Sequence, residues 1–187
     1  SSPGTGTSLP VVKGLEQRVT AALQNERAVI LVDGRSGSGK STLARELAER
    51  HPELQLVRLD DFYPGWDGLE RGSRHVVDYV LDPVRPRWQA WDWVANAPGA
   101  WHELDPTRPV LIEGVGAITA ASRARADLAV WVETDDDTRR RRALERDGAT
   151  YEPHWERWAA QERALLAREH PRDGADFVVD ERSQSDM

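Results

Sequence analysis

The 187-residue sequence is long enough for one domain with a buried core, and its 39% hydrophobic and 30% charged content is typical of globular proteins. The net charge of −7 argues against a nucleic-acid-binding protein, because such domains usually carry a basic excess. The chain has no cysteine, which excludes disulfides and thiolate zinc sites, and it has neither a long apolar run nor a basic leader, so we expect a cytoplasmic protein that binds no membrane.

Both ends of the chain have a composition that predicts no regular secondary structure. Residues 1–8, SSPGTGTS, favour a disordered leader or a remnant of expression, and residues 181–187 favour a disordered tail. We predict a single domain over residues 9–180 between them.

Short apolar, β-branched segments alternate with segments of helical spacing along this domain. Leu15, Val19 and Leu23 repeat every four residues in a first predicted helix, and Leu43 and Leu47 do the same in a second. The segments predicted as buried strands are 28–33, 54–59, 109–114, 128–133 and 176–180. The alternation predicts an α/β fold, a five-stranded parallel sheet with helices on both faces.

Residues 34–41, GRSGSGKS, satisfy the phosphate-binding pattern G-x-x-x-x-G-K-[ST], with a predicted strand before them and an amphipathic helix after them. Glycines allow a tight turn whose N–H groups cradle phosphate oxygens. Lys40 is expected to reach the β- and γ-phosphates, and the Ser41 hydroxyl to ligate Mg²⁺. The predicted nucleotide-binding residues of this motif are Gly34, Ser36, Gly37, Ser38, Gly39, Lys40, Ser41 and Thr42. A flexible Gly/Ser-rich turn is the alternative.

The segment 64–108 is too long for a simple connection and is rich in proline, glycine and tryptophan. We predict a partly helical insertion that carries function. Its tryptophans could stack on the ring or sugar face of a ligand, or they could form the insertion's own small core. They are Trp88, Trp91, Trp93 and Trp101.

Residues 134–148, TDDDTRRRRALERDG, predict a helix that Thr134 or a neighbouring aspartate caps and Gly148 ends. Three arginines share one face at positions i, i+3 and i+7. They are Arg139, Arg142 and Arg146. Aligned guanidinium groups suit triphosphate oxygens, so residues 135–150 are predicted as a lid over the phosphates, with a solvated basic face as the alternative.

Four motifs together resemble the uridine kinase and phosphoribulokinase-like group of P-loop kinases. The resemblance covers residues 27–63 and 109–180. The motifs are GRSGSGKST at 34–42, DDFY at 60–63, LIEG at 111–114 and DTRRRRALERD at 137–147. Neither an N-K-x-D nor a D-x-x-G signature of a GTPase occurs, and a helicase or assembly-type ATPase normally needs a longer chain.

The resemblance implies that Asp60 lies near the acceptor hydroxyl and the metal, where a carboxylate would receive the hydroxyl proton. It makes Tyr63 a neighbour of the acceptor and Arg146 a ligand of the nucleotide, although Ala143 stands where the family often has another arginine. The residues given a catalytic role are Asp60, Lys40, Arg139 and Arg142. The residues expected to hold Mg²⁺ are Ser41, Asp60 and Glu113.

The acceptor side departs most from the family. Nucleoside kinases of this group carry an F-D-x-P-like element whose carboxylate holds ribose hydroxyls, and VLDPVRP offers Asp82, with Asp78 as a second candidate. We also assign Arg87 and Trp88 to the acceptor.

The resemblance implies an ATP- and Mg²⁺-dependent kinase that phosphorylates a hydroxyl of a small molecule, most simply a nucleoside. Kinases of a sugar, polyol or cofactor precursor, a nucleoside monophosphate kinase, and a non-catalytic ATP-binding regulatory protein remain as alternatives.

Overall fold

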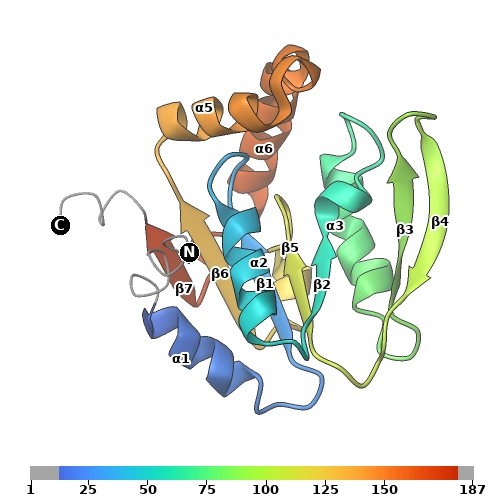
Figure 1. Ribbon diagram of the computed structural model, residues 1–187, viewed down its shortest axis with the longest axis vertical. Helices are drawn as coiled ribbons and strands as arrows, with labels where there is room; N and C mark the ends of the chain where they lie inside the picture. The colour runs from blue at the N-terminus through green and yellow to red at the C-terminus, as the bar shows by residue number, and fades with distance from the viewer. Residues whose placement is uncertain (1–12, 181–187) are drawn as a thin grey trace, which may run out of the picture.

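The computed structural model describes residues 13–180, and the two predicted irregular ends lie outside this range (Figure 1). Its centre is a five-stranded sheet in the order β2-β5-β1-β6-β7, and every neighbouring pair is parallel. The strands are β1 (Val29–Asp33), β2 (Gln55–Arg58), β5 (Val110–Glu113), β6 (Leu128–Glu133) and β7 (Phe177–Asp180). All five predicted strands and the α/β class are confirmed.

Both faces of the sheet are covered, because alternate residues of each strand point to opposite sides. Ile30 and Val32 of β1 pack with α1 (Lys13–Ala22) and α2 (Lys40–Arg50), whereas Val29 and Leu31 pack with α3 (Leu69–His75) and α6 (Trp155–Glu169). The remaining helical elements are a π-helical turn at Val76–Val80, α4 (Ala120–Arg123), α5 (Asp136–Asp147) and 3₁₀ turns at Leu59–Asp61, Gly148–Thr150 and Glu152–His154.

The insertion is helical only in its first half. After α3 and the π-helical turn, the chain forms an antiparallel hairpin of β3 (Arg87–Asp92) and β4 (Ala97–Glu103), which the prediction of a helical insertion missed. The Asp92 carboxylate accepts hydrogen bonds from two loop N–H groups, and Asn96 adopts a left-handed conformation at φ 53°. Aromatic residues on both sides of an Asp/Asn turn favour a hairpin, so the signal was present in the sequence.

The parallel strands end at one edge of the sheet, where ligands bind in such folds. The loop from β1 to α2 and the 3₁₀ turn after β2 both lie at this edge, and α5 crosses above the loop (Figure 1). Among residues 13–180, no helix is long and apolar enough to span a membrane.

Candidate active site

The phosphate-binding loop and the lid enclose a cavity of about 140 Å³. Gly37 and Gly39 adopt left-handed conformations, with φ 80° and 97°. A Cβ on Gly37 would lie 2.0 Å from the Arg139 carbonyl oxygen, so the backbone of α5 rests directly on the loop. The cavity is lined by Gly37, Gly39, Lys40, Ser41, Thr42, Arg142 and Arg146. The shape and the lysine suit phosphate groups at the N-terminus of α2.

The first part of the loop is turned toward the protein. The Gly34 N–H donates to the Asp33 carboxylate at 2.7 Å, and the Ser38 carbonyl accepts the Thr134 hydroxyl at 2.9 Å. Neither Gly34 nor Ser38 lines the phosphate cavity. Gly34 and Ser38 thus shape the loop, although the motif had placed them among the nucleotide contacts.

The predicted row of three arginines is divided between two environments. Arg142 and Arg146 line the phosphate cavity. The Arg139 side chain is only 5% exposed, donates to the Ser36 carbonyl at 3.1 Å and lies 4.0 Å from the Glu162 carboxylate. The prediction that Arg139 joins the other two over the phosphates needs correction, because its guanidinium is buried behind the loop.

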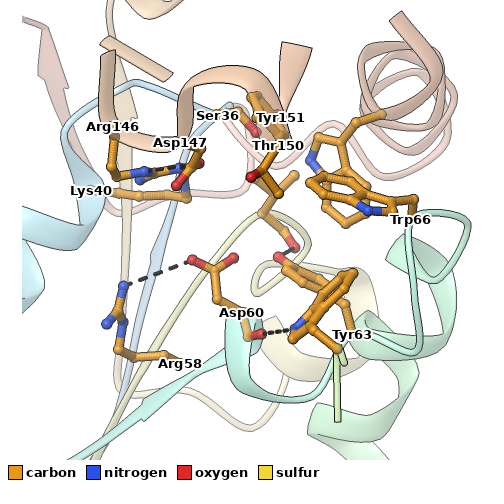
Figure 2. A pocket seen from close by; sticks show the side chains of 13 residues that line it. Ser36, Lys40, Arg58, Asp60, Tyr63, Trp66, Arg146, Asp147, Thr150 and Tyr151 are labelled. Carbon is orange, nitrogen blue, oxygen red and sulfur yellow. Dashed lines mark hydrogen bonds and ion pairs between the residues drawn. The ribbon is translucent and has the colours of Figure 1, made fainter. Parts of the chain in front are cut away.

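A second cavity, of about 600 Å³, opens beside the first, and Lys40 and Arg146 line both. The residues around it come from the phosphate-binding loop, β2 and the turn after it, the insertion, the loop after β5, the end of the lid and α6 (Figure 2). They are Ser36, Lys40, Arg58, Asp60, Tyr63, Trp66, Trp93, Val115, Arg146, Asp147, Thr150, Tyr151 and Trp158. A molecule in the second cavity would therefore lie next to phosphates in the first.

Asp60 projects into the larger cavity from the 3₁₀ turn after β2. Figure 2 shows its carboxylate between Arg58 on one side and Lys40 with Arg146 on the other. The side chain is about half exposed, and its Oδ2 lies 3.8 Å from the Arg58 guanidinium. The same guanidinium donates to the Glu113 carboxylate at 3.4 Å, and Glu113 itself is buried at the end of β5. Arg58 thus joins the two carboxylates that the resemblance assigns to catalysis and metal binding.

Aromatic rings form the far wall of this cavity. Trp66 and Trp93 lie with ring centroids 5.3 Å apart, and His154 stacks on Trp66 at 4.3 Å. The Tyr63 and Trp158 rings form a T-shaped pair with their centroids 4.8 Å apart. The Trp93 indole N–H also donates to the Asp60 carbonyl at 3.3 Å. One end of the cavity is therefore charged and the other is apolar and aromatic.

Tyr63 lies at the cavity as predicted, and its hydroxyl is bound by the protein. It donates to the Val115 carbonyl at 2.7 Å, and burial raises the pKa of the phenol well above its ordinary value. A phenol that stays neutral and hydrogen-bonded supplies no acid–base chemistry.

A buried aspartate joins the phosphate-binding loop to the loop after β5. Asp33 accepts N–H groups from Gly34 at 2.7 Å, Gly116 at 3.2 Å and Ile118 at 2.9 Å. Burial raises the pKa of this carboxyl to about 7, although the three N–H donors oppose the shift. Asp33 therefore fixes the start of the phosphate-binding loop relative to the loop after β5, which carries Val115.

Asp82 lies at the opposite edge of the sheet, which corrects its assignment to the acceptor. Its carbonyl accepts a hydrogen bond at 3.1 Å from Arg27, which precedes the amino end of β1. Its carboxylate accepts the N–H groups of Val84 and Arg85 within its own turn. The D-P element therefore closes a turn here, away from both cavities.

Arg87 and Trp88 pack on their neighbours and do not line either cavity. The Arg87 guanidinium lies 5.1 Å from the Tyr79 ring and 5.2 Å from the Trp101 ring. Trp88 stacks on His102 at 4.2 Å across the hairpin. The structure therefore gives no support to their assignment to the acceptor, because the sequence could not show which tryptophans of the insertion belong to its small core.

Sequence reasoning missed several residues of the site. Arg58 precedes the DDFY motif and carried a visible signal, a basic residue at the end of a buried strand. Trp66 was not among the tryptophans considered, and Trp93 was considered but could not be separated from the packing tryptophans without the hairpin. Glu162 gave no signal, because one glutamate in a charged helix looks like any other.

Comparisons with known proteins agree with this geometry. A family model described as AAA domain matches residues 30–163. The uridine kinase of Lactobacillus johnsonii is 24% identical, covering 88% of this chain and 92% of its own length, and that of Borrelia hermsii is 26% identical over 84% and 88%.

Two solved structures share the fold at a TM-score of 0.61. A possible uridine kinase from Bacillus stearothermophilus is 20% identical and covers 91% of this chain and 98% of its own. A protein from Silicibacter sp. TM1040, described as a candidate fructose transport system kinase, is 22% identical and covers 89% and 98%. With the matched family model, the lysine-bearing phosphate cavity and the adjoining carboxylate cavity, the chain belongs to the AAA-domain family of P-loop proteins, as a small-molecule kinase of the uridine kinase group.

Proposed function

We propose that this kinase transfers the γ-phosphoryl group of ATP, with Mg²⁺, to a hydroxyl of a small molecule, and that the acceptor is a nucleoside. The observation that carries the proposal is the position of Asp60 in a cavity that shares Lys40 and Arg146 with the phosphate cavity. An acceptor hydroxyl near Asp60 would lie beside the terminal phosphate. The absence of cysteine fits the reducing cytoplasm in which we place the reaction.

In this proposal the chain contributes alignment, charge neutralisation and one proton acceptor. Asp60 takes the proton of the attacking hydroxyl, and the Arg58 guanidinium 3.8 Å away holds the carboxylate in place. Lys40, Arg142 and Arg146 balance the charge that spreads over the phosphoryl oxygens. The lid above them excludes water from the transfer.

The donor set also fits Mg²⁺. Ser41 lines the phosphate cavity and Asp60 lines the adjoining one, so both can offer oxygen, the ligand that Mg²⁺ prefers. Glu113 is buried and paired with Arg58, which suits support of a bound water better than direct contact. Among residues 13–180, no cluster of three acids or histidines forms a metal cage, and Mg²⁺ usually keeps waters and binds substrate phosphates instead. When bound, the ion neutralises charge on the phosphates.

The aromatic wall supports a nucleoside acceptor. Trp66 and Trp93 offer ring surface at the end of the cavity away from Lys40, where a planar base could stack while the ribose hydroxyl reaches Asp60. The names of the curated relatives point the same way. A sugar or polyol kinase is the second candidate, because a fold neighbour carries a name of that kind and Asp82 does not supply the expected ribose contact.

The proposal is tested by measuring ADP release over a panel of nucleosides, nucleoside monophosphates, sugars and vitamin precursors. We expect uridine or cytidine to raise the rate far above the slow background hydrolysis. Asp60→Asn should lower this acceptor-dependent rate by about 10²–10⁴-fold while ATP still binds.

An active Asp60→Asn variant would contradict the proton-acceptor role. A rate that responds only to sugars would move the acceptor to the second candidate. If no acceptor raises the rate, a regulatory protein that binds ATP without transferring phosphate becomes the better account.

A further inference from the structure

Two adjacent polar residues of α6 face the two halves of the site. Trp158, Gln161, Glu162 and Leu165 share one side of the helix at spacings of three and four residues. Trp158 and Leu165 are buried apolar residues of the core, as this side of the helix requires. Gln161 and Glu162 interrupt it with hydrogen-bonding groups whose partners lie in different loops.

Glu162 binds the phosphate-binding loop. Its carboxylate is buried at 1% exposure and accepts hydrogen bonds from Arg35 Nε at 2.8 Å, Ser36 N at 3.1 Å and Ser36 Oγ at 2.7 Å. The Arg139 guanidinium lies 4.0 Å away and donates to the Ser36 carbonyl. One carboxylate thus fixes the loop through three donors, and it touches neither cavity.

Gln161 binds the acceptor-side loop. Its side-chain N–H₂ donates to the Trp66 carbonyl at 2.6 Å, and its side-chain oxygen accepts the Leu69 N–H at 3.3 Å. An ion pair from Arg157, one turn earlier in α6, reaches Asp67 in the same loop. These contacts hold the segment whose Trp66 ring forms part of the cavity wall.

We propose that Gln161 and Glu162 are positioning residues that divide the site between them. Glu162 sets the phosphate-binding loop for the nucleotide, and Gln161 sets the loop 64–69 for the acceptor; the acceptor half rests on the proposed function. Because both side chains project from neighbouring positions of one rigid helix, α6 fixes the two loops relative to each other. Neither residue touches the reacting groups.

Isosteric substitutions separate the two roles. In Gln161→Glu, a carboxylate faces the Trp66 carbonyl and the donor is lost. In Glu162→Gln, an amide N–H₂ replaces one of the acceptor oxygens that the Arg35 and Ser36 donors need. Glu156→Gln makes the same chemical change at an exposed position of the same helix and serves as the matched control.

Hydrogen–deuterium exchange of the free protein tests the division without any acceptor. We expect Gln161→Glu to speed exchange in peptides covering 64–69 while 34–38 stay unchanged, and Glu162→Gln to do the reverse. The control variant should change neither segment. Equal acceleration of both segments in both variants would show a merely structural role, and no change in either would remove the positioning role.

Kinetics with ATP and uridine give the second readout. Gln161→Glu should raise the KM for uridine about tenfold and leave the KM for ATP unchanged, and Glu162→Gln should raise the KM for ATP about tenfold with the KM for uridine unchanged. Parallel changes in both constants for both variants would overturn the proposal.

If the wild-type protein does not phosphorylate uridine, the proposed acceptor fails, and ADP titration together with the exchange pattern decides the positioning roles. A larger loss of ADP affinity in Glu162→Gln than in Gln161→Glu then supports the division of roles. An equal loss in the two variants overturns it.

Discussion

The phosphate side and the acceptor side of this site are built in different ways. The phosphate cavity draws five of its seven lining residues from one continuous stretch, 37–42, and the other two from one helix. The larger cavity takes its walls from the phosphate-binding loop, β2 and the turn after it, the insertion, the loop after β5, the end of the lid and α6. The first is built mainly on one local motif, whereas the second is assembled from segments spread along the chain.

This difference teaches where sequence reasoning succeeds. Phosphate recognition depends on backbone N–H groups, glycine conformations and one lysine, all of which belong to residues that are consecutive in the sequence. Acceptor recognition depends on side chains brought together by packing. The predictions below test whether the two sides are as separate as the structure indicates.

Lys40→Ala should have the largest effect, because Lys40 lines both cavities. We expect kcat/KM to fall by roughly 10³-fold with a loss of nucleotide affinity, since the main cation of the phosphate cavity is removed. Steady-state kinetics and ADP titration measure both effects. Arg45→Ala, on the exposed face of the same helix, should leave both unchanged. Normal ADP affinity in Lys40→Ala would show that Lys40 does not contribute to nucleotide binding.

Arg139 and Arg142 should separate stability from catalysis within one helix. Arg139 is buried between Ser36 and Glu162, so Arg139→Ala should lower the free energy of unfolding by about 3 kcal/mol, because a buried carboxylate loses a cation. Arg142→Ala, at the phosphate cavity, should lower kcat and change stability much less. Urea unfolding with steady-state kinetics measures the contrast. A loss of kcat without a loss of stability in Arg139→Ala would show that Arg139 acts on the phosphates as first predicted.

Trp93→Ala should raise the acceptor KM by about tenfold and leave the KM for ATP unchanged, because the removed ring faces only the larger cavity. Asp82→Asn is the matched test of the corrected assignment. It should leave both KM values at the wild-type level, since Asp82 lies at the amino edge of the sheet. A raised acceptor KM in Asp82→Asn would return that residue to the substrate.

Asp33 should make the stability of the folded protein depend on pH. Its pKa is raised to about 7 in the folded protein from an ordinary value of 3.8, so the folded state binds the extra proton. The stability that this proton contributes is fully present below about pH 4 and is lost as pH rises through 7, at no more than about 1.4 kcal/mol per pH unit.

Urea unfolding of the wild type and Asp33→Asn between pH 5 and 8 measures this dependence. The variant should show a flatter profile in that window. Identical slopes in the two proteins would mean that the buried carboxyl keeps an ordinary pKa.

Much of the fold was readable from the sequence because its signals are local. Apolar strand segments, helical spacing and glycine-rich turns are consecutive patterns, and all five strands appear where they predict. The hairpin β3–β4 was missed because its tryptophans alternate weakly with small and polar residues, and a long irregular stretch hides a short turn.

The site residues show the same difference between local motifs and long-range packing. Lys40, Ser41 and Thr42 line the phosphate cavity where the motif predicted them, and Asp60 lines the adjoining one. Asp82 and Trp88 line neither cavity, because the packing of their neighbours decides which side chains of the insertion reach the site.

The sequence by itself determined the parallel sheet, the phosphate-binding loop and the carboxylate after β2, because each depends on residues close together in the chain. Only the tertiary structure decided which arginine is buried, which tryptophans form the cavity wall, and that Gln161 and Glu162 hold the two loops. Those outcomes depend on contacts between segments as much as 127 residues apart, such as Arg35 and Glu162, and packing at that separation leaves no pattern in consecutive residues.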